Sequence, residues 1–101
     1  MREQATALLE AFSRSDLTVI ERLCAEDVLL VGTDTGERWE GRVAVLTAFA
    51  GAFDLAVAWA QEPTLRDDWV FGDVLFDDQP ARVTMVFRDG LLAHAHYSVA
   101  A

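Results

Sequence analysis

Two histidines near the end of the chain, His94 and His96, are the side chains best suited to acid–base chemistry. Imidazole has an unperturbed pKa of about 6.5, so it can take up or release a proton at neutral pH. Asp34 lies in Thr33-Asp34-Thr35-Gly36, directly after an apolar run, where a carboxylate could orient a histidine or act as a base. These three residues are the candidate catalytic residues. Each also has a structural interpretation: the imidazoles as hydrogen-bonded core residues, and Asp34 as ordinary turn chemistry.

The same histidines do not make a complete metal site. A His-x-His pair on a strand supplies only part of a zinc or iron site, and Asp34 or Asp73 would have to converge on it. Cys24 is the only cysteine, which excludes an intrachain disulfide and a thiolate cluster from one chain. We therefore predict no metal and no cofactor.

Large apolar side chains supply the candidate lining of a binding pocket. Tryptophan combines a large apolar area with one polar N–H group, which suits an apolar ligand that carries a ring. The alternative is that these side chains are plain core. The predicted pocket residues are Trp39, Trp59, Trp69, Met85 and Phe87.

Composition limits the class of partner. The chain has 101 residues, 52% of them hydrophobic, which predicts one folded domain over residues 1–101 and excludes disorder. The net charge of −9 would repel nucleic acid and anionic membrane surfaces. Residues 43–61 are mostly apolar, but Asp54 near their centre disfavours membrane insertion. With no signal-peptide pattern at the N-terminus, we expect a cytoplasmic protein.

Hydrophobic periodicity predicts three helices and a hairpin in the first half of the chain. Apolar residues at i, i+3, i+4 and i+7 predict a helix over residues 2–13, and a second apolar stripe predicts another over residues 17–24. The segments 28–31 and 37–40 flank turn residues and predict a hairpin. A third helix is predicted to open at Gly41.

The second half of the chain has the pattern of four strands, at residues 55–61, 69–76, 82–88 and 91–99. Asp89-Gly90 between the last two favours a two-residue type I′ turn, because both residues tolerate a positive φ. In the resulting register Arg88 faces Leu91, Phe87 faces Leu92, Met85 faces His94 and Val83 faces His96. One face of this hairpin then carries both histidines.

The other face of the same hairpin is also apolar. An antiparallel sheet with two apolar faces needs a cover on each, which predicts helices on one face and a second copy of the chain on the other. A β-bulge in either strand would reverse this assignment of faces. The predicted interface residues of the homodimer are Arg82, Val86, Ala93, Ala95 and Tyr97.

Several short segments carry a resemblance to a known family. They are Val31-Gly32-Thr33-Asp34, Glu37-Arg38-Trp39-Glu40-Gly41, Gly72-Asp73-Val74, and residues 82–98 with Asp89-Gly90 and His94-Ala95-His96-Tyr97-Ser98. With the order of elements, these resemble the nuclear transport factor 2-like (SnoaL-like) superfamily over essentially the whole chain. The resemblance implies a cystatin-like α+β cone, in which three N-terminal helices and a hairpin pack on a curved, mostly antiparallel sheet around a pocket. It also implies a dimer or larger ring.

The resemblance is more specific for fold than for activity, since isomerases, cyclases, dehydratases, hydrolases and non-catalytic association domains share it. Steroid isomerisation of the superfamily type needs a pocket tyrosine, and epoxide hydrolysis needs a pocket arginine. The register above points Tyr97 and Arg82 the wrong way for both. Cyclase or dehydratase chemistry needs a histidine near an aspartate, which the candidate catalytic residues supply.

We therefore expect a protein that binds a small, mostly apolar molecule in the cone pocket. Its expected chemistry is acid–base catalysis by His94 or His96, of isomerase, cyclase or dehydratase type. The alternative is a non-catalytic association or accessory dimerisation module, in which the same residues only pack.

Overall fold

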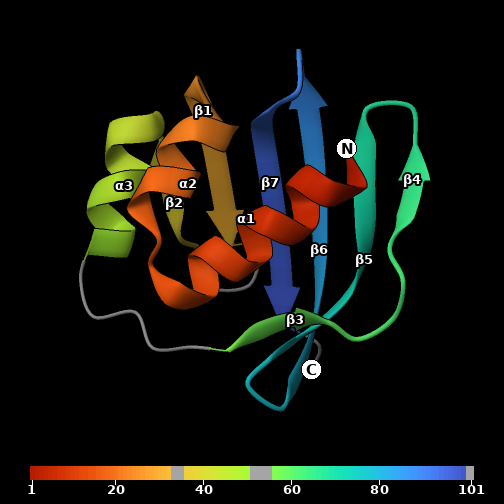
Figure 1. The fold of residues 1–101 in the computed structure, drawn as a ribbon. Coiled ribbons are helices and arrows are strands. Elements are labelled where there is room, and N and C mark those ends of the chain that lie inside the picture. Colours follow the sequence, from red (N-terminus) through yellow and green to blue (C-terminus); the bar gives the residue numbers. More distant parts are fainter. Residues whose placement is uncertain (33–35, 51–55, 100–101) are drawn as a thin grey trace.

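The structure is a computed structural model, and it describes residues 1–32, 36–50 and 56–99. Within these residues, three helices lie on one side of a seven-stranded sheet (Figure 1), which confirms the predicted α+β class. None of the described helices combines the length and the hydrophobicity that a membrane crossing requires. The elements in chain order are α1 (Arg2–Arg14), α2 (Leu17–Leu23), β1 (Cys24–Gly32), β2 (Arg38–Glu40), α3 (Arg42–Ala50), β3 (Val57–Trp59), β4 (Thr64–Arg66), β5 (Trp69–Phe76), β6 (Gln79–Arg88) and β7 (Leu91–Val99).

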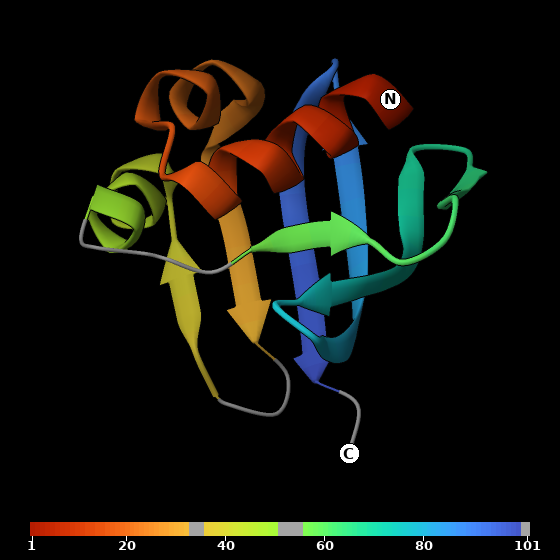
Figure 2. The ribbon, with the colours of Figure 1, turned by 60° about the horizontal axis from the view of Figure 1, so that its bottom comes forward.

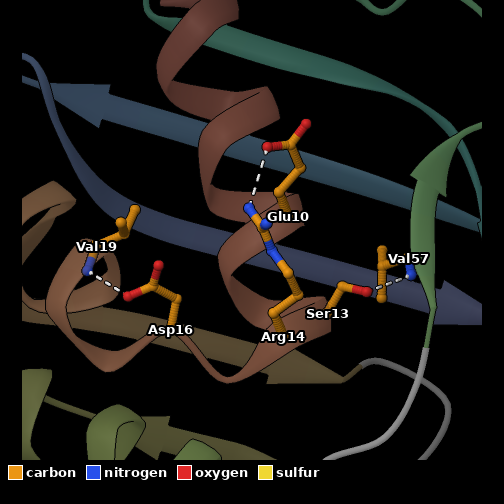
Figure 3. Close-up of polar contacts among 6 residues, drawn as sticks. All are labelled: Glu10, Ser13, Arg14, Asp16, Val19 and Val57. Carbon is orange, nitrogen blue, oxygen red and sulfur yellow. Dashed lines mark hydrogen bonds and ion pairs between the residues drawn. The ribbon is translucent and has the colours of Figure 1, made fainter.

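The first two helices form as the periodicity predicts. The apolar stripe of α1 is buried, and the helix ends where Ser15 adopts φ 53°. Asp16 then caps α2, because its carboxylate accepts a hydrogen bond from the backbone N–H of Val19 at 3.3 Å (Figure 3). Ser13 fixes α1 to β3 by accepting a bond from the N–H of Val57 at 3.2 Å (Figure 3).

The strands are ordered β2-β1-β7-β6-β5-β3, with β4 paired to β5. All pairs are antiparallel except β1 with β7 (Figure 2). The predicted hairpin between residues 28–31 and 37–40 is confirmed as β1–β2. The short strand β4 and the parallel pairing of β1 with β7 were not predicted.

The β6–β7 hairpin contains a bulge that changes the predicted register. Its turn is as predicted, because Asp89 and Gly90 both have positive φ, 54° and 78°, and Arg88 pairs with Leu91. Phe87 still pairs with Leu92, but the next pair is Val86 with His94. Ala93 is therefore the extra residue of a β-bulge, and the predicted pairs beyond it are wrong by one residue.

The sheet consequently has two different faces. We call the side under the helices the inner face; it carries the buried residues Val83 and Met85 of β6 together with Leu92 and Ala95 of β7. The side that points away from the helices is the outer face (Figure 1). Because side chains alternate along a strand, the outer face carries Leu29, Val31, Trp69, Phe71, Thr84, Val86, His94 and His96.

Candidate functional site

A cavity of about 260 Å³ lies between the helices and the inner face of the sheet. Its lining is mostly apolar and comes from helices α1 and α3 and from all strands except β4. The lining residues are Leu9, Phe12, Leu30, Glu37, Trp39, Phe49, Val57, Phe76, Val83, Met85, Ala95, His96 and Tyr97.

Aromatic rings form much of the cavity wall. Phe12 of α1 stacks on Phe49 of α3 with ring centroids 4.7 Å apart, and Trp39 of β2 lies 6.5 Å from the same phenylalanine. On the other side, Phe76 meets Tyr97 edge-on at 5.9 Å. Such packing fixes the rings, so the cavity is a preformed apolar space.

Tyr97 and Glu37 bring polar groups to this cavity. The Tyr97 hydroxyl donates a hydrogen bond to the Glu37 carboxylate. Tyr97 is half-buried on β7 and Glu37 is exposed just before β2, so the pair lies where the cavity meets solvent. The edge of the cavity therefore carries one hydroxyl donor and one carboxylate acceptor, the two kinds of group that a ligand with a polar end could meet.

His94 and His96 do not have the predicted orientation. Beyond the bulge, His94 pairs with Val86 and His96 with Thr84, so both rings lie on the outer face. Their centroids are 4.3 Å apart and their planes are at 80°. His96 borders the cavity only between its strand neighbours Ala95 and Tyr97, since alternate side chains point to opposite faces. The prediction that both imidazoles face the pocket is wrong.

The surroundings of His94 favour its neutral form. Burial lowers the pKa of His94, with smaller contributions from His96 and Arg38. Its Nε2 atom is buried and has no hydrogen-bond partner among the described residues. This imidazole therefore has one buried nitrogen that no described residue contacts by a hydrogen bond.

Of the predicted pocket residues, Trp39 and Met85 line the cavity. Phe87 is buried in the core instead, at 3% exposure. Trp59 packs at the edge of the core and donates its indole N–H to the Thr6 hydroxyl at 3.2 Å. Trp69 is 49% exposed on the outer face, so its predicted place in the pocket is wrong.

The predicted interface residues are divided between the two faces. Val86 and Arg82 lie on the outer face, and Ala93 is the bulge residue. Ala95 and Tyr97 line the cavity, so their predicted place on a face opposite the pocket is wrong. The same one-residue shift that moves the histidines out moves these two residues in.

Tyr97 and Glu37, which form the polar pair at the cavity edge, are not among the pocket residues predicted from the sequence. The pattern of the last hairpin predicts Tyr97 on the opposite face, and Glu37 is predicted as part of a hairpin and of a family segment, without a catalytic or pocket role. The predicted catalytic residue Asp34 lies outside the described residues. Within the residues that are described, no group of three or more His, Cys, Asp or Glu side chains gathers as a metal site would require.

Comparisons with known proteins agree with this geometry. The sequence profile of the SnoaL-like domain family matches residues 2–101. No curated protein sequence matches the chain.

Three solved structures illustrate the shared fold. A candidate ketosteroid isomerase from Kribbella flavida has a TM-score of 0.81 and 19% identity, with 99% of this chain and 77% of that one covered. A candidate polyketide cyclase from Sinorhizobium meliloti has a TM-score of 0.76 and 22% identity, with 96% and 94% covered. An LEH-like epoxide hydrolase from M. tuberculosis has a TM-score of 0.81 and 12% identity, with 98% and 81% covered. At these identities the likeness extends to the fold and not to an activity.

Proposed function

The chain belongs to the SnoaL-like domain family, and from this premise we propose that it binds one small, mostly apolar molecule in the cavity. The observation that carries the proposal is the combination of an aromatic, apolar lining with one polar pair at its edge. Sites for small molecules have this composition, because apolar area supplies affinity and a few polar groups set orientation.

The size of the cavity limits the ligand. Its volume of about 260 Å³ lies just below the roughly 300–1,000 Å³ of pockets that hold drug-sized molecules. We therefore expect a ligand of one or two rings, or a short branched chain. The pair at the cavity edge favours a ligand with a carbonyl or hydroxyl group at one end.

The chemistry we propose is proton transfer next to a carbonyl group. Glu37 takes a proton from the carbon beside the carbonyl, and the Tyr97 hydroxyl donates a hydrogen bond to the carbonyl oxygen as that oxygen gains negative charge. His94 and His96 have no part in it, because their rings lie on the outer face.

A matched pair of ligands tests the proposal. Ring compounds of one size, with and without a carbonyl group, are titrated against the protein while its melting temperature and intrinsic fluorescence are followed. Tyr97→Phe should weaken the binding of the carbonyl compound about threefold to tenfold, because one hydrogen bond contributes about 0.5–1.5 kcal/mol net. The same substitution should leave the affinity for the hydrocarbon unchanged. Glu37→Gln should abolish hydrogen–deuterium exchange at the carbon beside the carbonyl.

Tryptophan variants provide the control for this experiment. Trp39→Ala should weaken the binding of both ligands, because the Trp39 ring lines the cavity. Trp69→Ala on the outer face should change the binding of neither. If no compound raises the melting temperature, or if Trp69→Ala removes binding as Trp39→Ala does, the cavity proposal fails.

A second candidate function, association with a second copy of the chain, is favoured by the outer face. It carries the apolar side chains of Leu29 and Val31 on β1, Val86 on β6, and Phe71 and the half-exposed Trp69 on β5, with the two histidines of β7 between them. No described helix lies over it (Figures 1 and 2). An exposed apolar patch of this kind, rimmed by polar residues, is typical of an interface.

Charge also favours a second copy on this face. Arg38 pairs with Glu40 at 2.6 Å, and Arg82 pairs with Asp73 at 3.3 Å, so the rim is locally neutral. The chain as a whole carries a net charge of −9. These ion pairs limit the repulsion between two copies that approach through their outer faces.

Light scattering on an eluting column tests this candidate. The wild-type protein should have the mass of a dimer, and Val86→Arg at the centre of the outer face should have the mass of a monomer. Val43→Arg is the matched control, because Val43 is 77% exposed on α3, away from the sheet. A wild-type monomer, or a dimer that Val86→Arg leaves intact, contradicts association through this face.

A further inference from the structure

The cavity chemistry leaves two neighbouring imidazoles unused. His94 and His96 stand side by side on β7, two residues apart on the same face, with ring centroids 4.3 Å apart. The buried Nε2 of His94 has no hydrogen-bond partner among the described residues. A buried nitrogen without a partner is destabilising, so a ligand that this imidazole could bind after rotation would relieve that cost.

The immediate surroundings of the pair do not supply that ligand. Leu29 and Val86 flank His94 in the sheet, and Val31 and Thr84 flank His96. The charged groups of this face pair with each other, Arg38 with Glu40 on β2 at 2.6 Å and Arg82 on β6 with Asp73 at 3.3 Å. The two imidazoles are thus isolated donors of nitrogen lone pairs on a mostly apolar face.

Two imidazoles at this spacing suit a divalent transition-metal ion. Imidazole nitrogen binds zinc at about 2.0–2.1 Å and is a good ligand for cobalt, nickel and copper as well. Rings whose centroids are 4.3 Å apart are close enough for each to direct one nitrogen at a common ion once the side chains rotate. Two nitrogens are half of the four ligands that zinc ordinarily takes.

We propose that His94 and His96 bind one divalent transition-metal ion together with the same two histidines of a second copy. This inference rests on the second candidate function, association through the outer face, and is independent of the cavity ligand. The described part of one chain gathers no third His, Cys, Asp or Glu beside the pair, so the site is incomplete without the partner.

The position of the pair in the sheet favours a shared site. Strand β7 lies in the middle of the order β2-β1-β7-β6-β5-β3, which places both rings near the centre of the outer face. In a two-fold dimer the residues closest to the axis meet their own counterparts. Sheets packed face to face lie about 10 Å apart, a gap that one imidazole from each side can bridge with a metal ion between them.

Titration with Co²⁺ and Zn²⁺ tests the proposal. The protein is stripped with a chelator and titrated at pH 7.5 in excess Mg²⁺, which occupies the surface carboxylates. We expect saturation at one ion per two chains, the strong visible absorption of tetrahedral Co²⁺, and displacement of Co²⁺ by Zn²⁺. His96→Asn should weaken binding at least a hundredfold, and because His96 is exposed this variant should fold. Thr84→Val, beside His96 on β6, is the control that should bind as the wild type does.

The mass of the protein in each state separates the possible outcomes. A dimer in chelator that binds no Co²⁺ overturns the metal site and leaves association through the outer face intact. Saturation at one ion per chain overturns the shared site, as does binding that survives His96→Asn. A monomer with and without metal overturns both the metal site and the association.

Discussion

Cys24 illustrates how one buried side chain links the fold to pH. It opens β1 with no exposed surface, and burial raises the pKa of its thiol from 9.0 to about 11, although Arg42 partly opposes the shift. The folded state therefore holds the thiol proton more tightly than the unfolded state does. This contribution to stability is fully present below pH 9.0 and is lost as the pH rises through about 11.

We predict that Cys24→Ala removes part of the loss of stability between pH 9.0 and 11. A shift of this size corresponds to about 2–3 kcal/mol of unfolding free energy at most. Urea unfolding midpoints measured at pH 8, 9, 10 and 11 for both proteins check it. The urea midpoint of the wild type should fall more steeply with pH than that of the variant over this range. Midpoints that fall in parallel would contradict the burial of the thiol.

Met85 and its strand neighbour Val86 test the assignment of faces. Met85 is 1% exposed on the inner face and lines the cavity, whereas Val86 points to the outer face. We predict that Met85→Ala lowers the free energy of unfolding by about 2–5 kcal/mol, because removing buried methylene groups leaves a larger void. At protein concentrations low enough to keep the chain monomeric, Val86→Ala should lower the free energy of unfolding by less than about 1 kcal/mol. Urea unfolding of the variants measures both, and equal losses would contradict the faces described here.

At the scale of elements, the strands themselves follow closely from the sequence. Residues 69–76 and 91–99 were predicted as strands and are β5 and β7, and Asp89-Gly90 makes the predicted turn. These signals are local: alternation of apolar residues and a pair of residues that tolerate positive φ. Strand β4 carries no such signal, because its three residues are all exposed.

The bulge at Ala93 could not be predicted in the same way. Leu91, Leu92 and Ala93 are all apolar, so either register buries apolar side chains and local pattern does not choose between them. The choice depends on distant contacts, chiefly the parallel pairing of β7 with β1, whose own register shifts between Cys24 and Leu29. The fold was therefore predictable from the sequence, but the residues that face the cavity were not.

Deletion of single alanines tests the bulge directly. Without Ala93, the pairs Phe87–Leu92 and Val86–His94 become consecutive, so every later side chain keeps its face. We predict that the Ala93 deletion folds with a modest loss of stability and still binds the cavity ligand. Deletion of Ala95 should be far more damaging, since it turns His96 inward and Tyr97 outward. Circular dichroism and urea unfolding of both deletions provide the measurement, and equal damage by both would argue for the unbulged register.

At the scale of the whole molecule, one sheet separates two surfaces with different physical character. The cavity lies under the helices on the inner face, and the histidine pair and Trp69 lie on the outer face. Alternation along a strand makes the two surfaces independent in side-chain composition, although they share every backbone hydrogen bond of β6 and β7. A ligand in the cavity and a second copy on the outer face can therefore be bound together.

This independence has a thermodynamic consequence. If the chain dimerises through the outer face, unfolding requires dissociation, so the melting temperature must rise with the concentration of chains. We predict this rise for the wild type over a hundredfold range of concentration, and its absence in Val86→Arg. A cavity ligand should raise the melting temperature of both proteins by a similar amount, because Val86 does not line the cavity. Differential scanning calorimetry over that range measures both effects. A wild-type melting temperature that does not change with concentration contradicts the dimer. A ligand effect that is lost in Val86→Arg would mean that the two surfaces are coupled.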